Sequence, residues 1–328
     1  MLQMINRRME KALPFIVPSS VIVGVLFAPV FVHYASFVPW VFALITFAGS
    51  LRLSFSALKQ ALFHPIPMIT VLFLLHVFMP LWALGIGHLF FRGDHSTVLG
   101  LLLAVVIPTG VTSFIWVAIL RGNLAFALAV ILIDTFLSPF LVPGSLLVFA
   151  GNRVEIDAWK MMSGLFFMII FPSLLGMIVN QWAKKETKAS LEAVLSPVSK
   201  IALALVVMMN SAVVSPYLIH PNRTLFSIGF VVLLIASSGY FFSWMAARLL
   251  KFSQTDAIAL TFTGGMRNIS AGAVLAATYF PPKVSIPVVL GMLFQQVLAS
   301  LYGKFLGKHS NRETLSSLGA IRTERSGR

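Results

Sequence analysis

Two apolar stretches, LLLAVVIPTGVTSFIWVAIL (residues 101–120) and AIALTFTGGMRNISAGAVLAA (residues 257–277), decide the fold of this chain. Each is long enough to cross a membrane as a helix, but each has small, polar or helix-breaking residues near its middle, at 108–113 and 263–268. Lipid cannot satisfy the backbone groups that such a break frees, so paired breaks indicate a binding site within a membrane protein. The alternative is two ordinary proline and glycine kinks.

The composition around these stretches is that of a membrane protein. Of 328 residues, 58% are hydrophobic and only 10% are charged, which is less than half the charged share of a soluble domain. There is no cysteine, so thiolate metal sites, thiol nucleophiles and disulfides are excluded. The net charge of +14 lies in short segments and at the two ends rather than in one patch interleaved with aromatics, so nucleic-acid binding is disfavoured.

Ten segments contain the roughly 20 mainly apolar residues that a helix needs to cross the hydrocarbon core. They are residues 13–32, 37–58, 66–91, 97–120, 124–149, 159–181, 197–215, 224–247, 256–279 and 284–306. The first follows a basic start like that of a signal peptide. Its apolar run is too long, however, and no A-x-A cleavage site follows, so we expect a retained helix.

The distribution of Lys and Arg agrees with this count. If the N-terminus is cytoplasmic, 18 of these residues lie in cytoplasmic segments and 5 in outer loops, and only Arg267 lies within a span. Such a bias predicts ten helices with both termini in the cytoplasm, in the plasma (inner) membrane. Residues 309–328 are polar and are expected to form a flexible cytoplasmic tail.

The breaks fall in the fourth and the ninth span, which is the fourth helix of each half of a ten-helix chain. We therefore predict two repeats of five helices, residues 1–150 and 151–308. Because five is odd, the second repeat must be inserted upside down relative to the first. Freed carbonyls at the breaks can coordinate cations, and the N-termini of half-helices attract anions.

Two ionisable side chains lie deep within spans, Asp134 in the fifth and Arg267 in the ninth. Each costs roughly 2.5–3.5 kcal/mol at mid-helix, so both need a partner or a function. They could form a purely structural ion pair. Alternatively, Arg267 could meet an anionic substrate while Asp134 takes a proton, and these roles can coexist.

The other polar residues within spans have ordinary explanations beside the functional ones. His76 in the third span is more often a packing residue than a ligand, and the pair Gln295–Gln296 could bond between helices or to substrate. The hydroxyls near the first break could bond back to helix carbonyls. The chain has no H-E-x-x-H, G-x-S-x-G or Walker A motif, so no enzyme is indicated.

Five stretches together resemble the bile acid/sodium symporter (BASS) family. They are VFALITFAGSLRLSFSAL (41–58), HPIPMITVLFLLHVFMP (64–80), IPTGVTSFIWVAILRGN (107–123), LAFALAVILIDTFLSPFLVPG (124–144) and TGGMRNISAGAVLAATYFPP (263–282). The resemblance implies an all-α polytopic membrane protein with ten helices in two inverted repeats. Helices 3–5 and 8–10 would form a core and helices 1, 2, 6 and 7 a panel. Helices 4 and 9 would cross at their breaks beside two sodium sites, with an organic anion between core and panel.

On this basis we assign candidate site residues. Those expected to contact the substrate are Pro108, Thr109, Gly110, Thr112, Arg267, Asn268, Gln295 and Gln296. Those expected at a cation or coupling site are His76, Ser113, Asp134, Thr135, Thr263, Gly264 and Met266.

The chain departs from the family pattern at the sodium sites. Thr263 stands where the family has a sodium-binding glutamate, and Arg267 where a glutamine follows methionine. Phe114 replaces a usual asparagine, whereas Ser113 and Asn268 fit the pattern. A lost carboxylate and an added fixed cation would repel sodium, so we expect at least one sodium site to be lost.

The sequence therefore predicts a secondary transporter of a small organic anion that works by alternating access. The alternative is a sodium-independent transporter, proton-coupled or exchanging, that uses Arg267 and Asp134. A non-transporting membrane sensor or scaffold is more remote. No cofactor and no certain metal site are expected; Na+ and H+ are the candidate coupling ions, and the partners are the substrate and the lipid bilayer.

Overall fold

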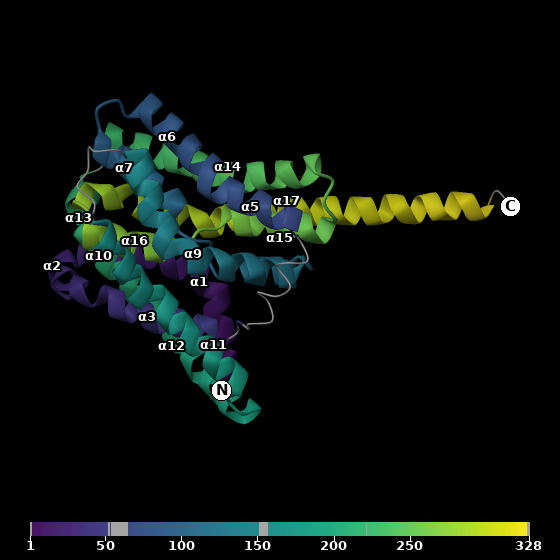
Figure 1. The fold of residues 1–328 in the computed structure, drawn as a ribbon, viewed down its shortest axis with the longest axis horizontal. Coiled ribbons are helices and arrows are strands. Elements are labelled where there is room, and N and C mark those ends of the chain that lie inside the picture. Colours follow the sequence, from purple (N-terminus) through teal and green to yellow (C-terminus); the bar gives the residue numbers. More distant parts are fainter. Residues whose placement is uncertain (1, 52, 54–64, 151–156, 221, 327–328) are drawn as a thin grey trace.

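The computed structural model describes residues 2–51, 53, 65–150, 157–220 and 222–326, and these ranges are almost entirely helical (Figure 1). The helices are α1 (Leu2–Leu26), α2 (Ala28–Phe31), η1 (Val32–Phe37), α3 (Val38–Ser50), α5 (Pro65–Phe73), η2 (Leu74–Phe78), α6 (Met79–Phe90), α7 (His95–Val106), α8 (Ser113–Ile119), α9 (Leu124–Ala150), α10 (Ala158–Leu165), η4 (Phe166–Ile170), α11 (Phe171–Trp182), α12 (Lys185–Val213), α13 (Ser215–Leu218), α14 (Arg223–Leu249), α15 (Gln254–Gly265), α16 (Ile269–Tyr279) and α17 (Pro282–Ser326).

Seven helical segments in the described chain are long and apolar enough to cross a membrane. They are Ala28–Ser50, Pro65–Phe90, Leu124–Phe149, Ala158–Trp182, Glu186–Val213, Arg223–Leu249 and Pro282–Gly307. Three shorter apolar helices, Phe15–Leu26, His95–Val106 and Ile269–Tyr279, match the remaining predicted spans. Two of these are short because the fourth and ninth predicted spans are broken where the sequence indicated. The count of ten spans and the inverted repeat stay predictions.

The first two predicted spans have shifted boundaries. The structure ends α1 at Leu26 and continues as one helical stretch from Ala28 to Ser50, where the sequence predicted 13–32 and 37–58. Pro29 and Pro39 sit at helix starts, where proline is tolerated because its missing N–H has no intrahelical partner anyway. Residues 54–58 of the predicted second span lie outside the described residues.

The flexible cytoplasmic tail expected at residues 309–328 stays a prediction. Helix α17 continues to Ser326 and projects away from the other helices (Figure 1). Its last proline is Pro287, so nothing after that position removes a backbone donor and ends the helix.

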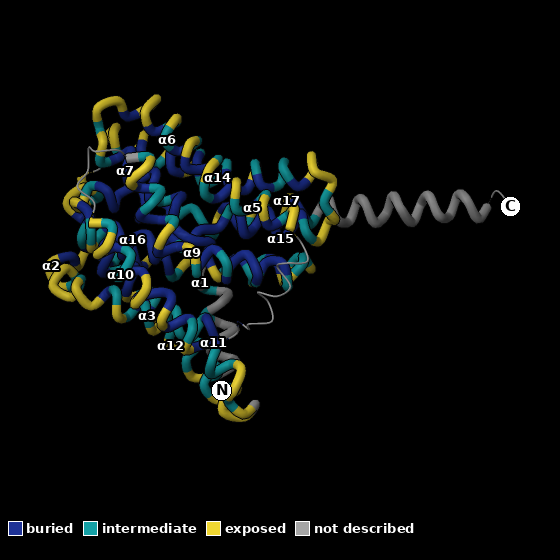
Figure 2. Tube along the Cα trace, in the orientation of Figure 1, coloured by how far each residue is buried: buried dark blue, intermediate teal, exposed yellow. Residues whose placement is uncertain are grey.

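The helices pack in two groups. Helix α1 packs along α12, and α3 packs against both α11 and α12. In the second group α7 packs against α6, α9 and α17, while α15 packs against α8, α9 and α14. Buried residues concentrate in helices such as α7, α15 and α16, and exposed ones lie on outer helices such as α2 (Figure 2). The most exposed large side chains include Phe15, Trp40 and Trp159, a surface that suits lipid rather than water.

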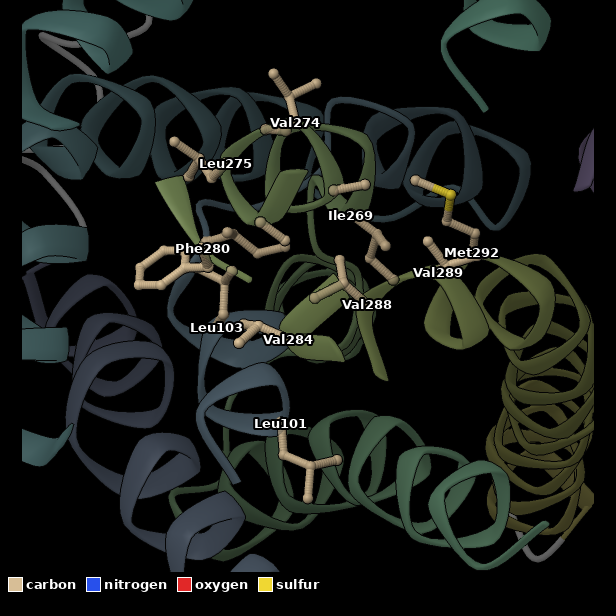
Figure 3. Close-up of a cluster of buried hydrophobic side chains, with 14 of the residues drawn as sticks. Leu101, Leu103, Ile269, Val274, Leu275, Phe280, Val284, Val288, Val289 and Met292 are labelled. Atoms are coloured by element: carbon tan, nitrogen blue, oxygen red, sulfur yellow. The ribbon is translucent and has the colours of Figure 1, made fainter. Parts of the chain in front are cut away.

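A hydrophobic cluster holds the two broken helices against α17. Leu101 and Leu103 of α7, Ile269 and Val274 of α16 and Val288 of α17 are all buried in it (Figure 3). Burying such side chains contributes about 1.5–3 kcal/mol each. The half-helix before the first break and the half-helix after the second are therefore positioned by apolar packing against α17.

The start of α7 is also tied to the start of α17 by a charged contact. Asp94 caps α7, accepting hydrogen bonds from the backbone N–H and the hydroxyl of Thr97 at 3.2 and 2.8 Å. Lys283 contacts the same carboxylate at 2.9 Å. Although partial burial opposes ionisation, hydrogen bonds from Lys283 and Thr97 hold the pKa of the Asp94 carboxyl below its ordinary value of 3.8.

This shift predicts a pH-dependent stability difference between wild type and Asp94→Asn. Because the folded pKa is depressed, the ionised carboxylate stabilises the fold above about pH 4, and that gain is lost as pH falls through the folded pKa. Asparagine retains the cap, so the wild-type thermal midpoint should exceed that of the variant by about 1–3 °C at neutral pH, because an exposed ion pair contributes little. Thermal unfolding in detergent measures this difference, and a difference that persisted unchanged to about pH 2.5 would contradict it.

Candidate functional site

The two broken helices cross, and their breaks pair with each other. The backbone N–H of Gly110 donates to the carbonyl of Met266 at 3.0 Å, and that of Asn268 donates to the carbonyl of Pro108 at 2.7 Å. These bonds are the rungs of a short antiparallel bridge. Backbone groups that lipid would leave unsatisfied are thus satisfied across the crossing.

Close approach at the crossing requires a glycine. A Cβ added to Gly110 would lie 2.8 Å from the carbonyl oxygen of Arg267, which is backbone and cannot swing aside. The bridge joins Arg267 to Thr109, the residue next to this glycine. The small residue in the first break is therefore needed for contact with the second break, as well as for weakening the helix.

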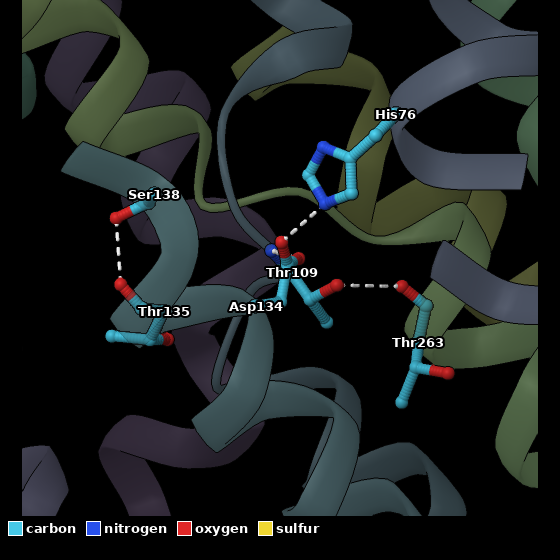
Figure 4. Close-up of polar contacts among 6 residues, drawn as sticks. All are labelled: His76, Thr109, Asp134, Thr135, Ser138 and Thr263. Carbon is cyan, nitrogen blue, oxygen red and sulfur yellow. Dashed lines mark hydrogen bonds and ion pairs between the residues drawn. The ribbon is translucent and has the colours of Figure 1, made fainter. Parts of the chain in front are cut away.

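Asp134 lies at the centre of a polar network beside the crossing (Figure 4). Its side chain is fully buried, and one carboxylate oxygen contacts Nε2 of His76 at 2.7 Å. The other oxygen accepts the backbone N–H of Thr109 at 2.6 Å. The hydroxyl of Thr109 donates to the carbonyl of Thr263 at 3.1 Å. The network thus links α9 and the π-helical turn η2 to both breaks.

His76 is part of this network rather than a residue that only fills space. It lies in η2, a single π-helical turn within the third predicted span, and such turns occur frequently at functional sites. Its spacing along the chain gave no indication of contact with Asp134, which is 58 residues away. Only the packing of the helices brings the two together.

Arg267 is buried without an ion-pair partner. Its side chain is 5% exposed, and neither terminal guanidinium nitrogen has a hydrogen-bond partner among the residues that the structure describes. Asp134 is committed to His76 and Thr109, so the Asp134–Arg267 ion pair considered from sequence is not formed. The backbone N–H of Arg267 donates to the side-chain oxygen of Gln295 at 3.0 Å.

The residues present do not fit a sodium site. The hydroxyl of Thr263 donates to the carbonyl of Ala259 at 2.8 Å, and the carbonyls of Thr263 and Met266 already accept hydrogen bonds. Sodium needs several oxygen ligands and is repelled by positive charge, and here no carboxylate stands at residue 263 while the guanidinium of Arg267 adds a positive charge. Within the described ranges no three His, Cys, Asp or Glu side chains gather as a metal cluster.

The remaining candidates for a cation or coupling site are Gly264, Thr135 and Ser113, and all three are buried. Gly264 is buried against Ser243, and Thr135 is buried with its carbonyl accepting from Ser138 at 2.7 Å. Ser113 is fully buried, and its hydroxyl has no partner in the part of the chain that is described. It lies at the start of α8, beside the first break.

A cavity of about 250 Å³ lies between the crossing and the helices α1, α3 and α12. Six of the eight predicted substrate contacts line it, as does Thr135; these six are Gly110, Thr112, Arg267, Asn268, Gln295 and Gln296. Pro108 and Thr109 do not line it, because their backbone and side-chain groups are used in the crossing.

The sequence did not identify the opposite wall of this cavity. Its polar members are Thr46, Ser50, Ser173, Glu192, Ser196, Ser199 and Lys200. Lys200 was counted only as a cytoplasmic charge in the topology. The signal that could have revealed this wall is the helical spacing of the polar residues 192, 196, 199 and 200.

Comparison with known proteins accounts for this architecture. The sequence pattern of the SBF-like CPA transporter family matches residues 14–308. The chain belongs to this family. It is thus a multi-pass membrane transporter of the BASS type and not an enzyme, in agreement with the resemblance seen in its sequence.

Three relatives of this SBF-like transporter align with most of its chain. It is 50% identical to YbaS of Bacillus subtilis strain 168 over 296 residues, which cover 90% of this chain and 97% of YbaS. It is 26% identical to the sodium-dependent transporter YocS of the same strain, over 90% of this chain and 91% of YocS. It is also 26% identical to the probable sodium/metabolite cotransporter BASS1 of Arabidopsis thaliana, over 78% of this chain and 63% of that protein.

Proposed function

We propose that this SBF-like transporter moves a small organic anion across the membrane by alternating access. The observation that carries the proposal is the cavity at the helix crossing, bordered by a buried arginine with no hydrogen-bond partner for its guanidinium tips within the described chain. A buried, unpaired charge is costly, and a protein that has kept one gains the most when a ligand compensates it.

The charges around the cavity favour an anion. Its ionisable lining consists of Arg267, Lys200 and Glu192, so positive charge exceeds negative. Asn268 caps the start of α16, and Ser270 of its first turn lines the cavity, so the positive end of this helix also faces the ligand. The positive end of α16 and the charge of Arg267 both attract an anion, and the low dielectric of the protein interior strengthens this attraction.

The size of the cavity limits the substrate. Its volume of about 250 Å³ lies just below the roughly 300–1,000 Å³ of sites for drug-sized ligands. A short metabolite fills such a space, whereas a large polycyclic acid does not. Most of the other lining side chains are apolar, among them Val17, Phe42, Ile169 and Met292, so the substrate should carry some hydrocarbon.

The proposal includes the membrane organisation predicted from sequence. Residues 1–150 and 151–308 would be inverted repeats, with spans 1, 2, 6 and 7 as a panel moving against a core of spans 3–5 and 8–10. Both termini would be cytoplasmic, in the plasma membrane. The packing of α1 along α12, and of α3 against α11 and α12, supports this division.

The coupling ion has two candidates. The names of YocS and BASS1 favour sodium. The residues at the crossing favour a sodium-independent cycle, proton-coupled or exchanging, because Thr263 supplies no carboxylate and Arg267 supplies a fixed positive charge there. Asp134 and His76, in contact at 2.7 Å beside the first break, would then hold the coupling proton.

A thermal-shift screen of short organic acids on the purified transporter tests the proposal. We expect one class of anions to raise the thermal midpoint by several degrees, through mass action on the folded state, equally with and without sodium. Uptake of the best anion into proteoliposomes should survive replacement of sodium by choline and respond to a pH gradient. A scaffold without transport would show no uptake, and full sodium dependence would overturn the sodium-independent cycle.

We expect Asp134→Asn to lower uptake of the anion strongly in the same assay. Asparagine keeps the size of the side chain but removes the charge that His76 and Thr109 contact. A proton-coupled carrier should lose the response to the pH gradient, with uptake at least about tenfold lower, since removing a charged hydrogen-bond partner is worth about 1.5–3 kcal/mol. A pH response identical to wild type would contradict the role of Asp134.

A further inference from the structure

Tyr279, the last residue of α16, contacts the first turn of α10. Its hydroxyl donates to the carbonyl of Lys160 at 3.1 Å, although the two residues are 119 positions apart in the chain. Gly164, one turn further along α10, makes room for the tyrosine, because a Cβ added there would collide with the hydroxyl and lie 3.0 Å from Cζ. The contact therefore needs a hydroxyl on one helix and the absence of a side chain on the other.

This contact joins the two bodies that would move in the proposed function. Helix α10 begins the sixth predicted span, which belongs to the panel, and α16 ends the ninth, which belongs to the core. The charge bias places the segments before α10 and after α16 on the outer side of the membrane. The hydroxyl of Tyr279 thus bonds across the boundary between panel and core, at its outer end.

The cavity at the crossing extends toward the opposite end of this boundary. Its lining includes Gly49 and Ser50 at the end of α3 and Glu192 in the first half of α12, which are the ends beside predicted cytoplasmic segments. Among the described residues, the lining includes none of α10 and nothing of α16 beyond Ser270. The cavity therefore reaches toward the cytoplasmic side, while the outer side carries the contact of Tyr279.

Apolar side chains beside this contact close the outer end against water. Met161 and Leu165 of α10 are buried in the same hydrophobic cluster as Phe280, which directly follows Tyr279. If panel and core part at this end, the exposed hydrogen bond from Tyr279 must break. One hydrogen bond changes an equilibrium by about two- to tenfold, so it can favour one orientation of the transporter without trapping it.

We propose that the contact between Tyr279 and Lys160 is a latch that keeps the outer end closed and leaves the substrate-free transporter open to the cytoplasm. The inference rests on the proposed function, because it assumes that panel and core move against each other. It adds the residues that set the balance between the two orientations. Tyr279 supplies the bond and Gly164 admits the tip of its ring, so loss of either raises the share of molecules whose crossing is reached from outside.

Thiol labelling tests the latch and needs no substrate. The chain has no cysteine, so Ser270→Cys introduces a single thiol at a half-buried position that lines the cavity beside the crossing. A membrane-impermeant maleimide would be added to right-side-out and to inside-out vesicles that contain the full-length chain. With the latch intact, labelling should be at least about tenfold faster in inside-out vesicles, as expected when the outward-open form is a minor state.

Two further substitutions in the Ser270→Cys background break the latch from its two sides. Tyr279→Phe removes the hydroxyl and keeps the ring, whereas the methyl of Gly164→Ala displaces the tip of the ring. Each should raise the labelling rate in right-side-out vesicles by about two- to tenfold. Gly85→Ala is the matched control and should leave the rate unchanged, because a Cβ there would meet no heavy atom within 4 Å among the described residues.

An unchanged rate in Tyr279→Phe would overturn the inference, as would equal labelling from both sides with the latch intact. Tyr279→Phe retains the packing of the ring, so it decides the question even if Gly164→Ala does not fold, which thermal unfolding in detergent would reveal. Failure of the proposed function would be seen separately, as absent uptake of every organic anion, because labelling measures only which side reaches the crossing.

Discussion

Arg267→Gln is expected to lower uptake of the organic anion by about ten- to a hundredfold while leaving the thermal stability of the transporter unchanged or higher. Arg267 is 5% exposed, and its guanidinium tips have no partner among the described residues, so the charge destabilises the empty protein. Removing a buried, unpaired charge relieves that cost. The anion loses its compensating charge at the crossing, which is worth about 1.5–3 kcal/mol.

Uptake into proteoliposomes and thermal unfolding of the same preparations measure the two halves of this prediction. Arg223→Gln is the matched control, because Arg223 is exposed at the start of α14 and lines neither the crossing nor the cavity. It should leave uptake unchanged. A role of Arg267 in folding alone would instead lower the thermal midpoint, and wild-type uptake by Arg267→Gln would refute its role in transport.

Gly110→Ala is expected to cause the second large effect, a loss of about 2 kcal/mol or more of stability together with most of the transport. The added methyl would lie 2.8 Å from the carbonyl oxygen of Arg267, well inside van der Waals contact. The two breaks would have to separate, which strains the 3.0 Å bond from Gly110 to Met266 and the 2.7 Å bond from Asn268 to Pro108. Overpacking of a tight interior typically costs about 1–3 kcal/mol, and broken buried hydrogen bonds add to it.

Gly144→Ala provides the control, because a Cβ at this position in α9 would meet no heavy atom within 4 Å in the described structure. Alanine favours the helix by up to about 1 kcal/mol over glycine, so this variant should be as stable as wild type or more so. Thermal unfolding in detergent compares the two substitutions directly. Equal stability of the two variants would show that the crossing tolerates separation.

The sequence predicted the breaks at 108–113 and 263–268 well, because proline and paired glycines act locally on the helix that contains them. Helix boundaries were less accurate near Pro29 and Pro39, where proline starts helices instead of ending them. Among the site residues, Gly110, Thr112 and Asn268 were assigned to the substrate cavity from sequence and do line it. Lys200, which the sequence analysis counted among the cytoplasmic charges, also lines this cavity, and the charge count gave no indication of that.

Contacts between helices distant in sequence could not be read from local patterns. Both Asp134 and Arg267 stood out as charges within apolar spans, and pairing them with each other was the simplest guess. In the structure the Asp134 carboxylate instead contacts His76 and Thr109, and the guanidinium tips of Arg267 have no hydrogen-bond partner among the described residues. Register and rotation of each helix within the bundle decide such choices, and these depend on packing over the whole interface.

By itself, then, the sequence determined that this chain is a multi-pass membrane protein of a transporter family, and where two of its helices break. Hydrophobicity, charge bias and helix-breaking residues act within a single segment, so they can be recognised in the sequence before the fold is known. Only the tertiary structure decided that the breaks satisfy each other, that the guanidinium tips of Arg267 have no hydrogen-bond partner in the described chain, and that Arg267 and Lys200 line one cavity. These features arise when side chains from distant segments share one low-dielectric space, where a few ångströms decide which charges are compensated.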